Sequence, residues 1–164
     1  MLVLRYAYLL ALVVWLGGIV VLGAVVAPSV FQVLPTREPE AGRILAGAVF
    51  GAALGRFHYV AYGCGAVLIL TLLSMAVLGP RPAQFALRTI LAAIMLGVAV
   101  YSGVVVLGSV HRLQREIGID VAPSSLPPGD ARRASFDRLH LLSTRLMMVN
   151  LVGALVLLYW EARE

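Results

Sequence analysis

Three histidines, His58, His111 and His140, carry the side chains with the widest chemical range in this sequence. Neutral imidazoles bind zinc, copper and haem iron, and three of them leave one coordination position open. The three histidines are 53 and 29 residues apart, and the lone cysteine, Cys64, excludes a thiolate cluster within one chain. The fold would therefore have to assemble any metal or haem site. The alternative is that each imidazole is an interfacial residue, hydrogen-bonded to a loop or a helix end.

A second set of chemically useful side chains recurs at helical spacing near the C-terminus. Phe136, His140, Ser143, Met147 and Asn150 step by three or four residues. On one helix they lie within roughly 80° of one another. Imidazole, hydroxyl and amide groups are costly to expose to hydrocarbon, so this stripe is predicted to face the interior of a helix bundle.

Arginines accompany the histidines at the ends of apolar runs. Arginine binds phosphate or carboxylate through two parallel hydrogen bonds, although anchoring to lipid headgroups is an equally good explanation for each of these residues. The combination predicts a polar pocket for a small polar or anionic ligand. Its candidate members are Gln32, Arg56, His58, His111, Arg112, His140, Ser143 and Asn150.

Composition restricts the remaining function classes. The 13 basic residues outnumber the 8 acidic ones, but they lie between apolar blocks rather than on one face, so nucleic acid is not an expected partner. No nucleophile and base occur at a recognised spacing, and no phosphate-binding glycine loop is present. An enzyme is therefore the least supported class.

The elements that must position these residues are membrane helices. Hydrophobic residues make up 61% of the chain and charged residues 13%, which indicates that lipid is the main solvent. A spanning helix needs about 20 apolar residues, and the apolar runs show no alternation typical of barrel strands. We predict an all-α polytopic membrane protein in which residues 1–164 form a single domain, an antiparallel bundle of four transmembrane helices. The predicted spans are residues 6–27, 57–78, 89–110 and 139–160.

The connection between the first two spans contains a further apolar segment, Ile44 to Gly55, which is too short to cross the bilayer. We predict that it forms a short interfacial or re-entrant helix, with a bend near Gly55. Gly47, Gly51 and Gly55 recur every fourth residue, a pattern that allows another helix to approach closely. The alternative is that a glycine-rich sequence produces such patterns by chance.

Four spans place both termini and the second connection on one membrane face, and the other two connections, with all three histidines, on the opposite face. That opposite face has more arginines than the terminal face, namely Arg37, Arg43, Arg56, Arg112, Arg115, Arg132, Arg133 and Arg138 against Arg5, Arg81, Arg88 and Arg163. The positive-inside rule predicts that the arginine-rich face is cytoplasmic and the termini are not. We expect the protein in a bacterial inner membrane.

Several motifs resemble those of the transmembrane-protein-205-like family (domain of unknown function 4149), a group of four-helix membrane proteins without a settled activity. The similar residues are Trp15-Leu16-Gly17-Gly18 with Pro28 and Phe31 after it, Arg56-Phe57-His58, and Phe136-Asp137-Arg138-Leu139-His140-Leu141-Leu142-Ser143 followed by Asn150. The spacing in the last of these is the most specific. The resemblance implies the four-helix fold and the location of the polar cluster, but no substrate.

Three functions remain open at this point. The first is a bundle that binds or moves a small polar or anionic ligand, which for transport would require a homo-oligomer. The second is a metal- or haem-binding bundle that uses His58, His111 and His140. The third is a non-catalytic scaffold, in which the stripe of Gly47, Gly51 and Gly55 packs against a membrane protein partner or a second copy.

Overall fold

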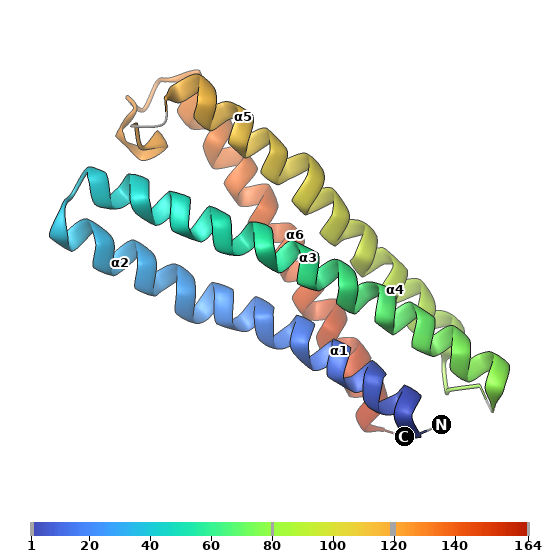
Figure 1. Ribbon diagram of the computed structural model, residues 1–164. Helices are drawn as coiled ribbons and strands as arrows, with labels where there is room; N and C mark the ends of the chain where they lie inside the picture. Colours follow the sequence, from blue (N-terminus) through green and yellow to red (C-terminus); the bar gives the residue numbers. More distant parts are fainter. Residues whose placement is uncertain (1, 80, 119–120, 164) are drawn as a thin grey trace.

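A computed structural model describes residues 2–79, 81–118 and 121–163 of the protein, so Pro80, in the connection between the second and third predicted spans, lies outside the described residues. Every regular element in these ranges is helical (Figure 1), which confirms the all-α prediction. In chain order the elements are α1 (Leu2–Val20), the π-helical segment η1 (Val21–Val26), α2 (Ala27–Arg37), α3 (Ala41–Leu78), α4 (Phe85–Val100), the π-helical segment η2 (Tyr101–Val106), α5 (Leu107–Ile117), the 3₁₀ turn η3 (Pro123–Ser125) and α6 (Ala131–Ala162).

These elements join into four long helical rods, each apolar enough to cross a membrane. The rods span Leu2–Arg37, Ala41–Leu78, Phe85–Ile117 and Ala131–Ala162, with 36, 38, 33 and 32 residues. At about 1.5 Å per residue they are roughly 48–57 Å long, well beyond the ~30 Å hydrocarbon core. The predicted four-helix membrane bundle is confirmed, and the rods extend past the spans proposed from apolar length alone.

The first connection differs from the prediction. Residues 44–55 do not form a separate interfacial or re-entrant helix, because they are the first turns of α3, which continues without interruption to Leu78. The chain reverses only at residues 38–40, between α2 and α3. The physical reason is that α3 contains no proline, and glycine weakens a helix by only about 1 kcal/mol relative to alanine. The glycines near residue 55 therefore do not end the helix.

The first rod also continues through Pro28, which directly follows the predicted span of residues 6–27. Pro28 has no N–H group, and its ring crowds the carbonyl four residues earlier. The π-helical segment η1 ends two residues before this proline, and the N–H of Ala27 donates to the carbonyl of Leu22, five residues back. We attribute the continuity of the rod to this wider turn, which gives the proline ring room.

The tightly packed half of the bundle lies toward the termini. Its largest fully buried apolar side chains come from all four rods and are Tyr8, Leu12, Trp15, Leu68, Leu72, Met95 and Leu157. Glycine permits the closest helix approaches here, since a Cβ on Gly153 would lie 2.7 Å from the sulfur of Met95. This half has the small-residue packing expected of membrane helices.

A buried charge cluster joins three rods at the same end. Arg88 on α4 is 2% exposed, and its Nη1 donates to Oε2 of Glu161 on α6 at 2.9 Å. The other carboxylate oxygen of Glu161 accepts a hydrogen bond from Arg5 on α1. Figure 1 shows the two ends of the chain side by side at this end.

At the opposite end the bundle separates into two hairpins. There α2 packs along α3, and α5 packs along α6. The two pairs diverge in Figure 1, with α2 and the start of α3 on one side and α5 on the other. We name these pairs the α2–α3 hairpin and the α5–α6 hairpin. Five of the eight predicted polar residues line cavities in or next to the space between them.

Candidate functional site

Two adjoining cavities lie between the hairpins. The outer cavity has a volume of about 1070 Å³ and lies near the tips, and the inner cavity has a volume of about 560 Å³ and reaches into the bundle. Residues that line both cavities join them, namely Phe31, Gly47, His111, Gln114, Phe136 and His140. The volume of the inner cavity is within the range of small-molecule binding sites, and that of the outer cavity is slightly above it.

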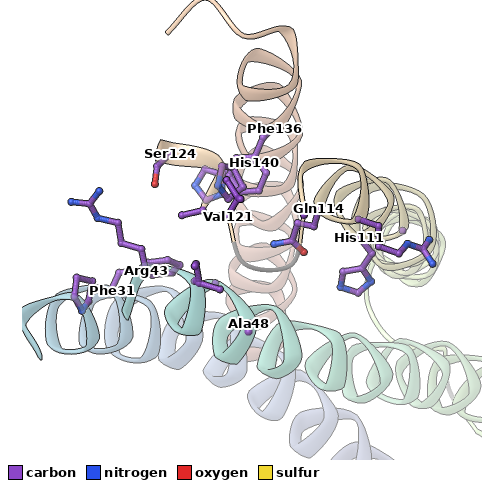
Figure 2. A pocket seen from close by; sticks show the side chains of 17 residues that line it. Phe31, Arg43, Ala48, His111, Gln114, Val121, Ser124, Phe136 and His140 are labelled. Carbon is purple, nitrogen blue, oxygen red and sulfur yellow. The ribbon is translucent and has the colours of Figure 1, made fainter. Parts of the chain in front are cut away.

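Most of the outer-cavity lining is apolar, and the polar residues among its described members are basic or neutral (Figure 2). Arg43 comes from α3, Gln114 and His111 come from α5, and His140 comes from α6, so both hairpins contribute. Arg115 of α5 lines the same cavity. None of the described residues that line it is an aspartate or a glutamate. A concave site lined by charges of one sign concentrates ligands of the opposite sign, in this case anions.

Helical spacing explains how α5 presents its polar groups. His111, Gln114, Arg115 and Gly118 are separated by the three- and four-residue steps of one helix face, and all four line the outer cavity. Gly118 ends α5 with a φ of 112°, a left-handed conformation that favours glycine. The α5 face that carries these residues is therefore the wall of the cavity.

The glycine stripe of α3 forms the opposite wall. A Cβ built on Gly47 or Gly51 meets no atom within 4 Å, and one on Gly55 comes only to 3.7 Å from Leu107. Within one chain, the predicted close helix packing against this stripe is therefore not present. Gly47 and Gly51 instead leave room for the inner cavity, which both of them line.

The inner cavity is mainly apolar and is bounded by both π-helical segments. Gly23 and Ala24 of η1 and Ser102 and Val106 of η2 line it, and none of its described lining residues is Asp, Glu, Lys or Arg. Single π-helical turns inside α-helices occur frequently at functional sites. Sequence patterns did not indicate either segment, although Pro28 is a signal that could have marked η1.

His58 closes the inner cavity toward the packed half of the bundle. Its side chain is buried, and Nδ1 donates a hydrogen bond to the carbonyl oxygen of Leu54 at 2.8 Å. A neutral imidazole that donates from Nδ1 presents Nε2 as an acceptor. The ring lies against Gly103, where an added Cβ would be 2.7 Å from His58 Cδ2 and 2.0 Å from Tyr62 Oη. Glycine at this position lets η2 approach α3.

Beyond His58 lies a third, much smaller cavity of about 20 Å³. His58, Ser102, Ser143 and Asn150 line it, and the first three also line the inner cavity. Asn150 is 6% exposed, and its Oδ1 accepts no hydrogen bond from any described residue. The volume is close to that needed by one water molecule. The stripe of polar residues on α6 therefore ends, at Asn150, beside a cavity the size of one water molecule.

The structure brings five of the eight predicted pocket residues together. His58, His111, His140 and Ser143 line the inner cavity, and Asn150 lines the small cavity next to it. The stripe predicted on the last helix therefore faces the bundle.

Gln32, Arg56 and Arg112 lie elsewhere. All three are exposed, and none lines the outer or the inner cavity. Arg56 borders a separate, more open hollow that adjoins the two large cavities and shares His111 and Gln114 with them. Arg112 donates to Ser109 Oγ at 3.3 Å. The reason is helical phase, because Arg112 is turned by about 100° from His111.

The three histidines do not assemble a metal site in the described part of the chain, where no group of three or more His, Cys, Asp or Glu side chains is placed to hold an ion. His58 is bonded to the backbone of its own helix. The His140 ring is stacked on Phe136, with ring centroids 6.4 Å apart and planes 8° from parallel. All three line the inner cavity, but only His111 and His140 also line the outer one, and His58 lies deeper.

Sequence reasoning missed the outer-cavity residues Arg43, Gln114 and Arg115. Two of them follow from His111 by steps of three and four residues, which is the same rule that found the stripe on α6. Arg43 lies four residues before Gly47, on the line of the glycine stripe. Extending the glycine stripe by one turn toward the N-terminus, and applying the same spacing rule from His111, would have selected these residues in place of Arg56 and Arg112.

Comparison with known proteins adds a family but no activity. The family model described as "Domain of unknown function (DUF4149)" matches residues 10–118, about two thirds of the chain. This region includes the motifs at Trp15 and at Arg56–His58, whereas the motif that ends at Asn150 lies outside it. No curated protein and no solved structure matches the chain.

Proposed function

We propose a ligand-binding function for this chain, which belongs to the DUF4149 family and is an integral, multi-pass membrane protein. The outer cavity binds a small polar or anionic ligand between the α2–α3 and α5–α6 hairpins. The narrower assignment to the transmembrane-protein-205-like proteins rests on the spacing from Phe136 to Asn150 and is part of this proposal.

One observation carries the proposal. Two arginines from facing hairpins, Arg43 and Arg115, line a cavity in which no described lining residue is acidic. A pair of guanidinium groups around a hollow attracts an anion, and each can hold phosphate or carboxylate oxygens with two hydrogen bonds.

The test is equilibrium binding of inorganic phosphate to the full chain in a non-ionic detergent. Removing both charges in Arg43→Gln with Arg115→Gln is expected to weaken binding by at least about tenfold per arginine, because a hydrogen bond to a charged group contributes about 1.5–3 kcal/mol. Binding to the unmodified chain should also weaken as the salt concentration rises.

The matched control removes two arginines from the same two helices outside the large cavities. Arg56→Gln with Arg112→Gln causes the same change in net charge and affects two exposed residues. Phosphate binding by this variant should equal that of the unmodified chain. Equal losses in both double variants would mean that binding follows net charge, and the proposed site would be wrong.

The cavity faces the cytoplasm in this proposal, because the membrane face at which it opens has eight arginines in sequence and the terminal face has four. Both termini are then on the other side of a bacterial inner membrane. A reporter that is active only outside the cytoplasm, fused to the C-terminus, should be active. Activity of a cytoplasm-specific reporter at the same position would reverse the orientation.

A further inference from the structure

We infer that the occupant of the two cavities is an anionic phospholipid of the surrounding bilayer, with its phosphate in the outer cavity and one acyl chain in the inner cavity. This inference rests on the proposed anion site and names the class of its ligand. Three independent features support it, namely the chemistry of each cavity, the depth of each cavity along the helices, and an opening on the side of the bundle.

Apolar residues predominate in the lining of both cavities, but the two differ in charge, as the two parts of a phospholipid do. The outer cavity contains the arginines and has about 1070 Å³, far more than a carboxylate alone requires. The inner cavity has about 560 Å³, is lined by apolar side chains such as Phe50, Leu54 and Leu107, and has no described charged residue in its lining. An inorganic anion would leave the inner cavity without a partner of matching chemistry.

Depth along the helices agrees with the orientation of a membrane lipid. The inner cavity extends to Gly23, Ser102 and Met147, which lie within the predicted apolar spans. The outer-cavity arginines, Arg43 and Arg115, lie beyond the ends of those spans. Phosphate would therefore be at the level of the headgroups and the chain at the level of the hydrocarbon core.

The side of the bundle offers a route into the inner cavity. Val20 of α1 and Met148 of α6 both line it, and they are 47% and 45% exposed. Ala24 of η1 and Thr144 of α6 are also exposed lining residues. An acyl chain can therefore enter between η1 and α6 directly from the bilayer, without passing through water.

The experiment is native mass spectrometry of the full chain released from nanodiscs of phosphatidylcholine that contain a minority of phosphatidylglycerol. We expect a stoichiometric phosphatidylglycerol adduct despite the excess of phosphatidylcholine. In parallel samples, hexadecanol or palmitate is added to the nanodiscs. Hexadecanol has an alkyl chain but no charge and should not be retained by the protein. Retention of palmitate but not of phosphatidylglycerol would overturn the phospholipid assignment in favour of a fatty acid.

Two glycine substitutions on α3 separate the inner cavity from the anion site. Gly51→Leu adds a side chain where a Cβ meets no atom within 4 Å and fills the inner cavity, whereas Gly63→Leu makes the same change at an exposed position that lines neither cavity. Phosphatidylglycerol retention should fall at least fivefold in the first variant and remain unchanged in the second. Ser143→Leu fills the same cavity from α6 and replaces Gly51→Leu if that variant does not fold.

Phosphate binding distinguishes failure of this inference from failure of the proposed function. If Gly51→Leu retains phosphatidylglycerol as well as Gly63→Leu does, while phosphate binding still depends on Arg43 and Arg115, the acyl chain is not in the inner cavity and only this inference fails. If the Arg43→Gln and Arg115→Gln double variant binds phosphate normally, the anion site itself is absent and both fail.

Discussion

Replacing Gly103 with alanine tests the contact that shapes the deep end of the inner cavity. Only hydrogen occupies the space where a Cβ would lie 2.0 Å from Tyr62 Oη and 2.7 Å from the His58 ring. The tyrosine is half-buried and can turn away, but the histidine is 7% exposed and is held by its hydrogen bond to Leu54. The added methyl group must therefore displace the histidine or separate η2 from α3.

The magnitude is the difference between two opposing effects. Overpacking of a filled site costs about 1–3 kcal/mol, whereas alanine in place of glycine favours a helix by up to about 1 kcal/mol. Gly97→Ala on α4 measures the second effect alone, because a Cβ at Gly97 meets no atom within 4 Å. We expect Gly103→Ala to be less stable than Gly97→Ala by about 1–3 kcal/mol.

The assay is unfolding in mixed micelles by titration with a denaturing detergent, followed by tryptophan fluorescence. Adding Tyr62→Phe to Gly103→Ala removes the nearest atom and should recover part of the loss, with the remainder due to His58. If Gly103→Ala were as stable as Gly97→Ala, the close approach of η2 to α3 would not exist in the membrane protein.

Three further predictions concern the other polar groups of the bundle. Glu161→Leu should destabilise the protein strongly, and adding Arg88→Met should recover most of that loss in the same unfolding assay, because a broken buried ion pair costs more than one replaced by apolar side chains. Asn150→Leu should leave the unfolding midpoint equal or higher, since the change removes a buried acceptor without a partner among the described residues; a clearly lower midpoint would mean that Oδ1 is hydrogen-bonded. Asp130 caps α6, and the hydrogen bonds from the Arg132 side chain and then from its backbone N–H hold the pKa of this carboxyl below its ordinary value. Its stabilising effect is therefore present above a pH of about 3.9 and is lost as the pH falls through the lower folded pKa, so NMR should show acid-induced fraying of the first turn of α6 that Asp130→Asn abolishes.

The sequence was sufficient for the number and type of helices because apolar length is a direct consequence of bilayer thickness. The sequence did not predict where the helices end. Apolar length does not report how far a helix continues into water, so α3 begins at Ala41, sixteen residues before the predicted span. The continuation of the first rod past Pro28 involves a π-helical turn that we did not predict, although Pro28 could have indicated it.

The candidate site shows a similar division. The stripe on α6 could be predicted because its members lie on one helix, and their spacing alone determines which face they share. Which arginines line the cavity could not be predicted, because this depends on which faces of α3 and α5 meet across the space between the hairpins. That is why Arg43 and Arg115 line the cavity while Arg56 and Arg112 do not.

The role of each glycine was also hard to predict, because it depends on where the other helices lie. The regular stripe of Gly47 and Gly51 suggested helix packing, yet it borders open space within one chain. Close approaches occur at isolated glycines such as Gly103 and Gly153. A four-residue repeat identifies a smooth helix face, but only the positions of the other helices decide whether a helix or a ligand covers it.

The central claim, that the diverging hairpins enclose an anionic lipid, is tested most directly by a crystallographic map of the full chain grown in a lipid phase with phosphatidylglycerol brominated on its acyl chains. Anomalous bromine peaks are expected between η1 and η2, with phosphate density at Arg43 and Arg115. Bromine peaks only on the outer surface of the bundle, or α2–α3 and α5–α6 packed together without a cavity, would contradict the claim.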